Sequence, residues 1–221
     1  MALGILRSGL LAASALLAFS SVSQAGAPAQ IVRHAATHHV SQKNSDRSLT
    51  VLYDQTSHDS GIALVSQNSG GELSTEVADD FTVPENAHWT LQEVDIPGVY
   101  FNGSGPAPTV QVTIYKNKGH KPGGVKYTAA ITPGDDFGSF TLNVGNVKLK
   151  PGHYWLSVVA NMNFSSGGEW GWEVQTDGTV EGDRAVYRDF NSESCANWLT
   201  KKKCFGGNPG DQMFTLKGSA Q

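Results

Sequence analysis

The sequence predicts an all-β protein, an antiparallel β-sandwich of jelly-roll-like form. From about residue 48 onward, apolar residues recur at every second position, which is the period of a strand with one buried face. Segments rich in Gly, Pro, Asn and Ser separate these runs, and the chain holds 25 glycines. No amphipathic helical stretch follows the N-terminal region, so helical layers over a parallel sheet are not expected.

Three stretches show the alternation most plainly: "TVQVTIYK", "FTLNV" and "HYWLSVVANM". In each, one parity is apolar and is expected to face the core. The expected inward sets are Val110, Val112 and Ile114; Phe140, Leu142 and Val144; and Tyr154, Leu156, Val158, Ala160 and Met162.

The segment "HWTLQEVDIPGVYF" breaks its own alternation. Apolar residues before Gln92 and after Glu93 fall on opposite parities, so a β-bulge is expected near these two residues. Such a bulge also lets a strand bend between two sheets. The Pro97-Gly98 step is expected to end the pairing or to lie at a sheet edge.

Three regions are expected along the chain. Residues 1–25 have the features of a secretory signal peptide: an early Arg7, the apolar run "GLLAASALLAF" and small residues up to Ala25. Residues 26–47 are polar and are expected to form a flexible N-terminal segment. Residues 48–221 are expected to form a single β-sandwich domain.

Export and charge limit the classes of partner. The formal net charge of −4 argues against nucleic acid, because phosphate binding normally requires a basic excess. The apolar run near the N-terminus is shorter than the roughly 20 residues of a membrane span. A secreted, periplasmic or extracellular protein without a membrane span in the mature chain is therefore expected.

The two cysteines, Cys195 and Cys204, lie in "CANWLTKKKC". In an oxidising compartment, so close a pair is expected to form a disulfide that closes a short loop. Two thiols alone make a poor zinc site, since structural zinc usually takes four ligands.

Several motifs together resemble a β-sandwich module that recurs in exported bacterial proteins. They are "VADDFTVP", "WTLQEVDIPGVYFNGSGPAPTVQVTIYK", "LKPGHYWLSVVANMNF", "GGEWGWE" and "DQMFTLKG", and the resemblance covers about residues 50–219. That module has no assigned catalytic residues, so the resemblance implies fold and export rather than an activity. The Pro-Gly-x-Tyr-Trp stretch is also similar to the last strands of carbohydrate-binding sandwich modules, a likeness of fold alone.

No catalytic signature is present, and we expect no enzyme. The sequence lacks both a G-x-S-x-G elbow and an H-E-x-x-H helix. Glu169 and Glu173 are four residues apart, roughly 13 Å along a strand, and too far apart to act as a glycosidase pair by themselves. The scattered histidines are expected to be solvated: His58, His88, His120 and His153.

No metal site is assigned from the sequence. Calcium is the most plausible ion, through Asp79 and Asp80 at a strand entry or Asp135 and Asp136 in a turn. In either pair only one carboxylate is expected to face a given ion, and solvent-facing acids are the simpler interpretation. Opportunistic binding of a transition metal by His34, His38 and His39 in the N-terminal segment is an alternative.

Five aromatic residues are the candidate ligand-binding residues: Trp170, Trp172, Trp198, Tyr100 and Phe101. The two tryptophans of "GGEWGWEVQT" share one strand face, and two glutamates occupy the other. Since the glutamate face is expected to meet water, the indoles are expected to point inward. Trp198 in the disulfide loop is then the better exposed candidate, beside a lysine run expected to be solvated, and Tyr100 and Phe101 enter a loop.

These observations lead to one hypothesis and two alternatives. The first is a secreted, non-catalytic β-sandwich that binds an extracellular ligand, a polysaccharide or a cell-surface protein, through its loops. The second is a structural or assembly protein of the cell surface. The third is a hydrolase whose acids the sequence does not reveal.

Overall fold

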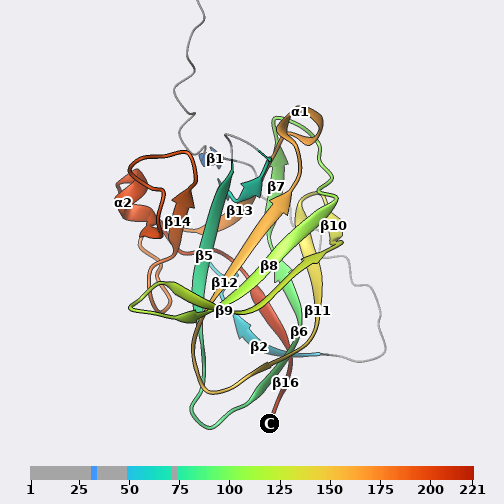
Figure 1. Cartoon of the computed structure of the whole chain (residues 1–221), viewed down its shortest axis with the longest axis vertical. Helices are drawn as coiled ribbons and strands as arrows, with labels where there is room; N and C mark the ends of the chain where they lie inside the picture. The colour runs from blue at the N-terminus through green and yellow to red at the C-terminus, as the bar shows by residue number, and fades with distance from the viewer. Residues whose placement is uncertain (1–30, 34–48, 71–73) are drawn as a thin grey trace, which may run out of the picture.

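A computed structural model describes residues 31–33, 49–70 and 74–221 (Figure 1). Of the described residues, 58% lie in strands and 5% in helices, which confirms the all-β prediction. The strands form three sheets, and β5, β12 and β8 run side by side in Figure 1. Every strand pairing between described residues is antiparallel except that of β4 with β12.

The sheets differ in size and order. The four-stranded sheet has the order β1 (Ile31–Arg33), β3 (Asp59–Val65), β13 (Glu169–Gln175), β7 (Gly98–Phe101). The five-stranded sheet has the order β10 (Gly134–Asp136), β11 (Ser139–Leu149), β6 (Trp89–Ile96), β16 (Thr215–Ala220), β2 (Thr50–Asp54). The seven-stranded sheet has the order β15 (Leu199–Thr200), β14 (Val186–Asp189), β5 (Thr75–Val83), β12 (Gly152–Asn161), β8 (Thr109–Asn117), β9 (Pro122–Ile131), and β4 (Gln67–Asn68) pairs with β12.

The predicted inward faces form the core of the sandwich. All the residues of the three expected sets are buried, and Val110, Val112 and Ile114 are each 0% exposed. The main apolar cluster takes side chains from all three sheets, so the seven-stranded sheet packs its inner face against the other two. Burial of each large aliphatic side chain stabilises the fold by about 1.5–3 kcal/mol.

The bulge predicted near Gln92 and Glu93 is present. β16 pairs with β6 through Glu93 and then through Leu91, and its register shifts there by the one residue Gln92. The apolar residues on both sides of the shift are buried. After Ile96 the chain leaves the five-stranded sheet and becomes β7, an edge strand of the four-stranded sheet, as the Pro97-Gly98 step predicted.

Three residues of the segment expected to be flexible, Ile31–Arg33, form β1, which pairs antiparallel with β3. The rest of 26–47 lies outside the described residues, so the expectation of a flexible segment stays a prediction. The signal-peptide prediction for 1–25 and the histidines His34, His38 and His39 lie outside the described residues.

Among the residues that the structure describes, two short helices lie in connections between strands. α1 (Phe164–Gly167) joins β12 to β13, and α2 (Lys201–Phe205) follows β15. Within the described residues, no helix has the length and apolar character required to cross a bilayer.

The predicted disulfide joins Cys195 to Cys204, with 6.0 Å between the Cα atoms. The disulfide joins the start of the loop that carries Trp198 to α2, and β15 lies between its two cysteines. We expect the double variant Cys195→Ser, Cys204→Ser to lose roughly 2–3 kcal/mol of unfolding free energy, because the short loop is no longer closed in the unfolded chain. Urea denaturation of both proteins measures this difference, and equal midpoints would show that the loop is held by its other contacts alone.

Candidate functional site

Trp170 and Trp172 lie in the core, as their strand parity predicted. Both are 0% exposed, and each indole Nε1 donates to a backbone oxygen, of Gly138 at 2.7 Å and of Met213 at 2.6 Å. Gly98 allows the approach of Trp170, because a Cβ there would lie 2.7 Å from the indole Nε1. Their assignment as ligand-binding residues is therefore wrong, since no ring surface remains for a ligand.

Glu169 and Glu173 do not face water, contrary to the prediction. They are 7% and 3% exposed, and all seven residues of β13 are buried. The parity argument failed because β13 lies between β3 and β7 in its sheet and residues of both its faces are buried. Glu169 Oε2 accepts a hydrogen bond of 2.6 Å from Asn102 Nδ2. These carboxylates are thus built into the fold and closed to a substrate.

Tyr100 shapes a loop instead of presenting its ring to solvent. Its hydroxyl donates to Asp135 Oδ2 at 2.7 Å and accepts from the backbone N of Ala107 at 2.8 Å. The ring lies against Gly105, where a Cβ would come within 2.5 Å of it. Burial raises the pKa of Tyr100, and the hydrogen bond to Asp135 raises it further. Phe101, the next residue, is half-buried beside Gly171.

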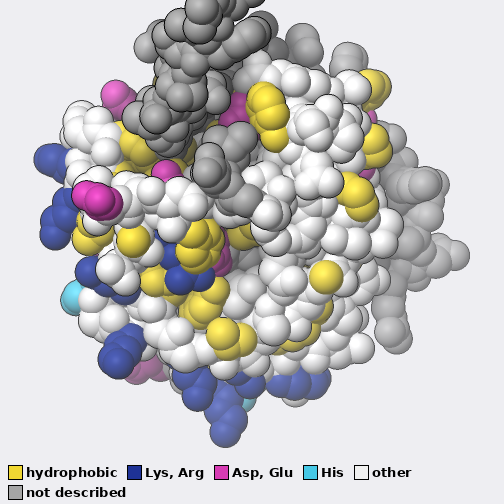
Figure 2. Space-filling view, turned by 45° about the horizontal axis from the view of Figure 1, so that its top comes forward, with side chains coloured by type: hydrophobic (Ala, Val, Ile, Leu, Met, Phe, Trp, Pro, Cys, Tyr) yellow, Lys and Arg dark blue, Asp and Glu magenta, His cyan; other side chains and the backbone are white. Residues whose placement is uncertain are grey.

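A groove of about 330 Å³ opens at the end of the sandwich that Tyr100 supports. Three chain segments build it: the turn after β4, the loop between β7 and β8, and the region from the end of β12 to α1. The described lining residues carry no charge; they are Asn68, Ser69, Gly70, Gly105, Pro106, Pro108, Asn161, Met162, Asn163, Ser166 and Gly167. Figure 2 shows mainly uncharged surface on the right of this end, with Lys and Arg gathered on the left and along the lower edge.

Backbone hydrogen bonds hold the walls of the groove together. Gly105 N donates to Gly167 O at 2.9 Å, and Met162 N donates to Asn68 O at 3.2 Å. The buried amide of Gln67 reaches the same region, where its Nε2 donates to Met162 O at 3.0 Å. These hydrogen bonds join the three segments that form the groove.

Trp198 does not present a free ring, although it was the best exposed candidate from the sequence. It is half-buried and packs on a small apolar cluster outside the main core, and the guanidinium of Arg188 lies 4.4 Å from its ring centroid. Arg188 also lies 4.7 Å from the ring of Phe190 and forms an ion pair with Glu76. The loop tryptophan thus covers the sheet, and Arg188 covers one of its faces.

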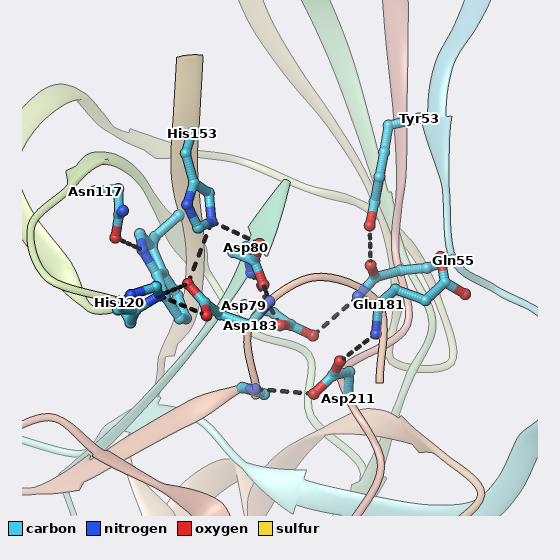
Figure 3. Close-up of polar contacts among 12 residues, drawn as sticks. Tyr53, Gln55, Asp79, Asp80, Asn117, His120, His153, Glu181, Asp183 and Asp211 are labelled. Atoms are coloured by element: carbon cyan, nitrogen blue, oxygen red, sulfur yellow. Dashed lines mark hydrogen bonds and ion pairs between the residues drawn. The ribbon is translucent and has the colours of Figure 1, made fainter. Parts of the chain in front are cut away.

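Asp79 and Asp80 point to opposite faces of β5, as adjacent strand residues must, but neither is solvent-facing. They are 0% and 2% exposed. Asp80 lies on the outer face of the seven-stranded sheet, where His153 of β12 is its neighbour (Figure 3). Asp80 Oδ2 lies 2.6 Å from His153 Nε2, and Asp80 Oδ1 accepts from Asp183 N at 2.9 Å.

Asp183 and His120 complete the cluster from two loops. Asp183 Oδ1 lies 2.8 Å from His120 Nδ1, and its Oδ2 lies 3.7 Å from His153 Nε2. His120 is solvated as expected, with its side chain 80% exposed, whereas His153 is only 26% exposed and faces Asp80, contrary to the expectation. Burial raises the pKa of Asp80 to about 8, and the neighbouring Asp183 carboxylate raises it as well. Burial lowers the pKa of His153.

On the inner side of β5, Asp79 belongs to a buried polar network (Figure 3). Its Oδ2 accepts from Gln55 Nε2 at 2.9 Å and from Gln212 N at 2.6 Å. Lys201 Nζ donates to Gln212 Oε1 at 2.6 Å and is 2% exposed, so the lysine run is solvated only at Lys202 and Lys203. Burial raises the pKa of Asp79 well above its ordinary value and lowers that of Lys201 to about 8.

Asp211 adds an anchor for the segment between β13 and β14. Its carboxylate accepts from the backbone N of Glu181 and of Ala185, both at 2.8 Å. That segment also carries Asp183, so Asp211 fixes the position from which Asp183 reaches the sheet. Sequence reasoning missed both residues, since their partners are far away in the chain and no local motif marks them.

The other aspartate pair lies in β10, directly before the β10–β11 turn, and not in the turn itself as predicted. Asp135 and Asp136 are exposed, and Asp135 is engaged by Tyr100 and by Gly138 N at 2.8 Å. In the described part of the chain, the three residues that could share a metal ion are Asp80, His153 and Asp183. The imidazole in this set makes an ion with mixed nitrogen and oxygen ligands a better fit than calcium.

Comparison with known proteins gives no relative: no family model, no curated protein and no solved structure matches the chain. The resemblance to an exported sandwich module therefore stays a prediction, and the function is argued from the sites themselves.

Proposed function

We propose that this protein is a non-catalytic binding module that holds a neutral glycan in the groove beside α1. The observation that carries the proposal is the chemistry of the described groove lining, which combines three asparagines and two serines with two prolines and a methionine and, among these residues, contains no charged side chain. Amides and hydroxyls exchange hydrogen bonds with sugar hydroxyls, and the apolar groups contact the C–H faces of a pyranose ring. The uncharged lining favours a neutral ligand over an acidic one.

The hydrogen bonds between the groove walls support the same function. A preformed site loses little conformational entropy on binding, and this helps a weakly interacting ligand such as a sugar. Tyr100 and Gln67 hold the groove walls in place: the Tyr100 hydroxyl accepts from Ala107 N, and Gln67 Nε2 donates to Met162 O. The sequence placed Tyr100 among the ligand-binding residues; we propose instead that it positions the loop that does the binding.

Asn163 is the most useful residue for a test. It lines the groove, is exposed, and precedes α1 without a side-chain capping hydrogen bond, so its amide is available to a ligand. On an array of neutral and acidic polysaccharides, we expect the protein to bind a neutral one. Asn163→Ala is expected to weaken that binding roughly 3- to 10-fold, the value of one hydrogen bond.

Two matched variants separate the groove from other surfaces. Phe137→Ala removes an aromatic ring that is 91% exposed in the β10–β11 turn, and Trp198→Ala removes the aromatic residue that the sequence favoured. We expect both to bind as the unsubstituted protein does. Loss of binding in Trp198→Ala, with full binding in Asn163→Ala, would show that the glycan binds at the disulfide loop and not in the groove. Absence of binding to every neutral polysaccharide on the array would refute the proposal.

A further inference from the structure

The cluster of Asp80, His153 and Asp183 lies apart from the groove and has no part in the function proposed above. It joins three separate segments of the chain: β5, β12 and the connection between β13 and β14. The ligand-type atoms of the three side chains all lie within 4.8 Å of one another. Figure 3 shows the three side chains directed toward one point, with His120 approaching from the β8–β9 turn.

The cluster lies at the border between the protein interior and solvent: Asp80 is buried, whereas the side chains of His153 and Asp183 are 26% and 24% exposed. Two carboxylates face each other, one of them 2% exposed, and in the described part of the chain imidazoles are their only ion-pair partners. A buried acid is ordinarily balanced by Lys, Arg or a metal ion. An ion bound between Asp80 and Asp183 would balance both carboxylates and use the lone pair of His153 Nε2.

We propose that Asp80, His153 and Asp183 bind a divalent transition-metal ion of the zinc type. Zinc accepts His nitrogen and Asp oxygen at about 2.0–2.2 Å, which places the ligand atoms of a tetrahedral site roughly 3.4 Å apart. Here Asp80 Oδ2 and Asp183 Oδ2 lie 2.6 Å and 3.7 Å from His153 Nε2, so small side-chain rotations suffice. Three protein ligands leave one coordination position toward solvent.

The surroundings hold the three ligands in place, as the outer shell of a metal site does. Asp80 Oδ1 is already occupied by the N–H of Asp183, which turns Oδ2 toward the ion. The ring of His153 stacks on Trp155 with centroids 5.9 Å apart, and His120 holds the Asp183 carboxylate. Gly182 lets the backbone approach Asp80 closely: it has φ +88°, and a Cβ at this position would lie 2.4 Å from Asp80 Oδ2.

Zinc titration of the full chain without a polyhistidine tag, after treatment with EDTA, tests the proposal. We expect isothermal titration calorimetry to give one bound ion per chain and the thermal midpoint to rise with ZnCl₂. His153→Ala and Asp183→Asn are expected to abolish binding. His120→Ala is expected to weaken it roughly 10- to 100-fold, as loss of an outer-shell partner does.

Controls must exclude the histidines of the N-terminal segment. The triple variant His34→Ala, His38→Ala, His39→Ala and the variant His88→Ala are expected to bind zinc as the unsubstituted protein does. Binding that disappears in the triple variant and persists in His153→Ala would overturn the proposal, as would binding of calcium without zinc.

Cobalt(II) provides a measurement that needs no variant. Cobalt bound to a four- or five-coordinate site with a His ligand is expected to give visible absorption bands several times stronger than those of the aquo ion. A spectrum equal to that of the aquo ion, at a concentration that saturates the zinc titration, would overturn the proposal even if a variant failed to fold. Neither result depends on whether the groove binds a glycan.

Discussion

Trp170→Ala is expected to lower the free energy of unfolding by about 3–5 kcal/mol, one of the two largest losses that we predict for a single substitution. The indole is fully buried, stacks on Phe140 at a centroid distance of 4.8 Å, and donates from Nε1 to Gly138 O. Alanine would leave both a large cavity and a buried carbonyl without its donor. Urea denaturation followed by fluorescence of the remaining tryptophans measures the loss.

Phe137→Ala is the matched control for this aromatic deletion. The Phe137 ring is 91% exposed, so its removal is expected to change stability by less than about 0.5 kcal/mol. A loss below 1 kcal/mol for Trp170→Ala would contradict the placement of β13 at the centre of the core.

Asp79→Ala is expected to cost about 3–5 kcal/mol, through electrostatics and hydrogen bonding instead of packing. Its carboxylate is the acceptor for Gln55 Nε2 and for Gln212 N, and all three residues are almost completely buried. Removal leaves these donors unpaired and leaves the ammonium group of Lys201 in the interior without the carboxylate that raises its pKa most. The midpoint of chemical denaturation reports the change.

A second substitution separates the charge from the hydrogen bonds. Adding Lys201→Met to Asp79→Ala is expected to recover part of the loss, because the buried cation that had lost its counter-charge is then absent. Losses that simply add in the double variant would show that Lys201 and Asp79 do not interact. Asp135→Ala, at an exposed carboxylate, controls for the general effect of removing an acid.

The sequence alone predicted the strands and the faces they bury. Alternation is a local property, so the inward set of β8 and the bulge at Gln92 followed from neighbouring residues alone. The same rule misplaced Glu169 and Glu173, because parity tells which residues share a face but not what covers that face. β13 is covered on both sides, and this depends on strands far away in the chain.

Sites were harder to predict than strands, for the same physical reason. Asp80 and His153 are 73 positions apart, and His120 and Asp183 are 63 positions apart, so only the pairing of β5 with β12 and the path of two loops bring them together. Trp198 was predicted to be exposed because it lies in the disulfide loop beside a lysine run, but an arginine from β14 covers one of its faces. The groove has no aromatic motif and is visible only once its three segments meet.

Glycan binding in the groove is the central claim, and amide chemical-shift mapping tests it most directly. A ¹⁵N-labelled sample would be titrated with neutral hexasaccharides of glucose, xylose, mannose and N-acetylglucosamine. We predict that one of them shifts the amide signals of Gly105, Asn163 and Gly167 while the indole signal of Trp198 stays unchanged. Shifts centred on Trp198, or no shift at millimolar concentrations of any of these sugars, would contradict the account.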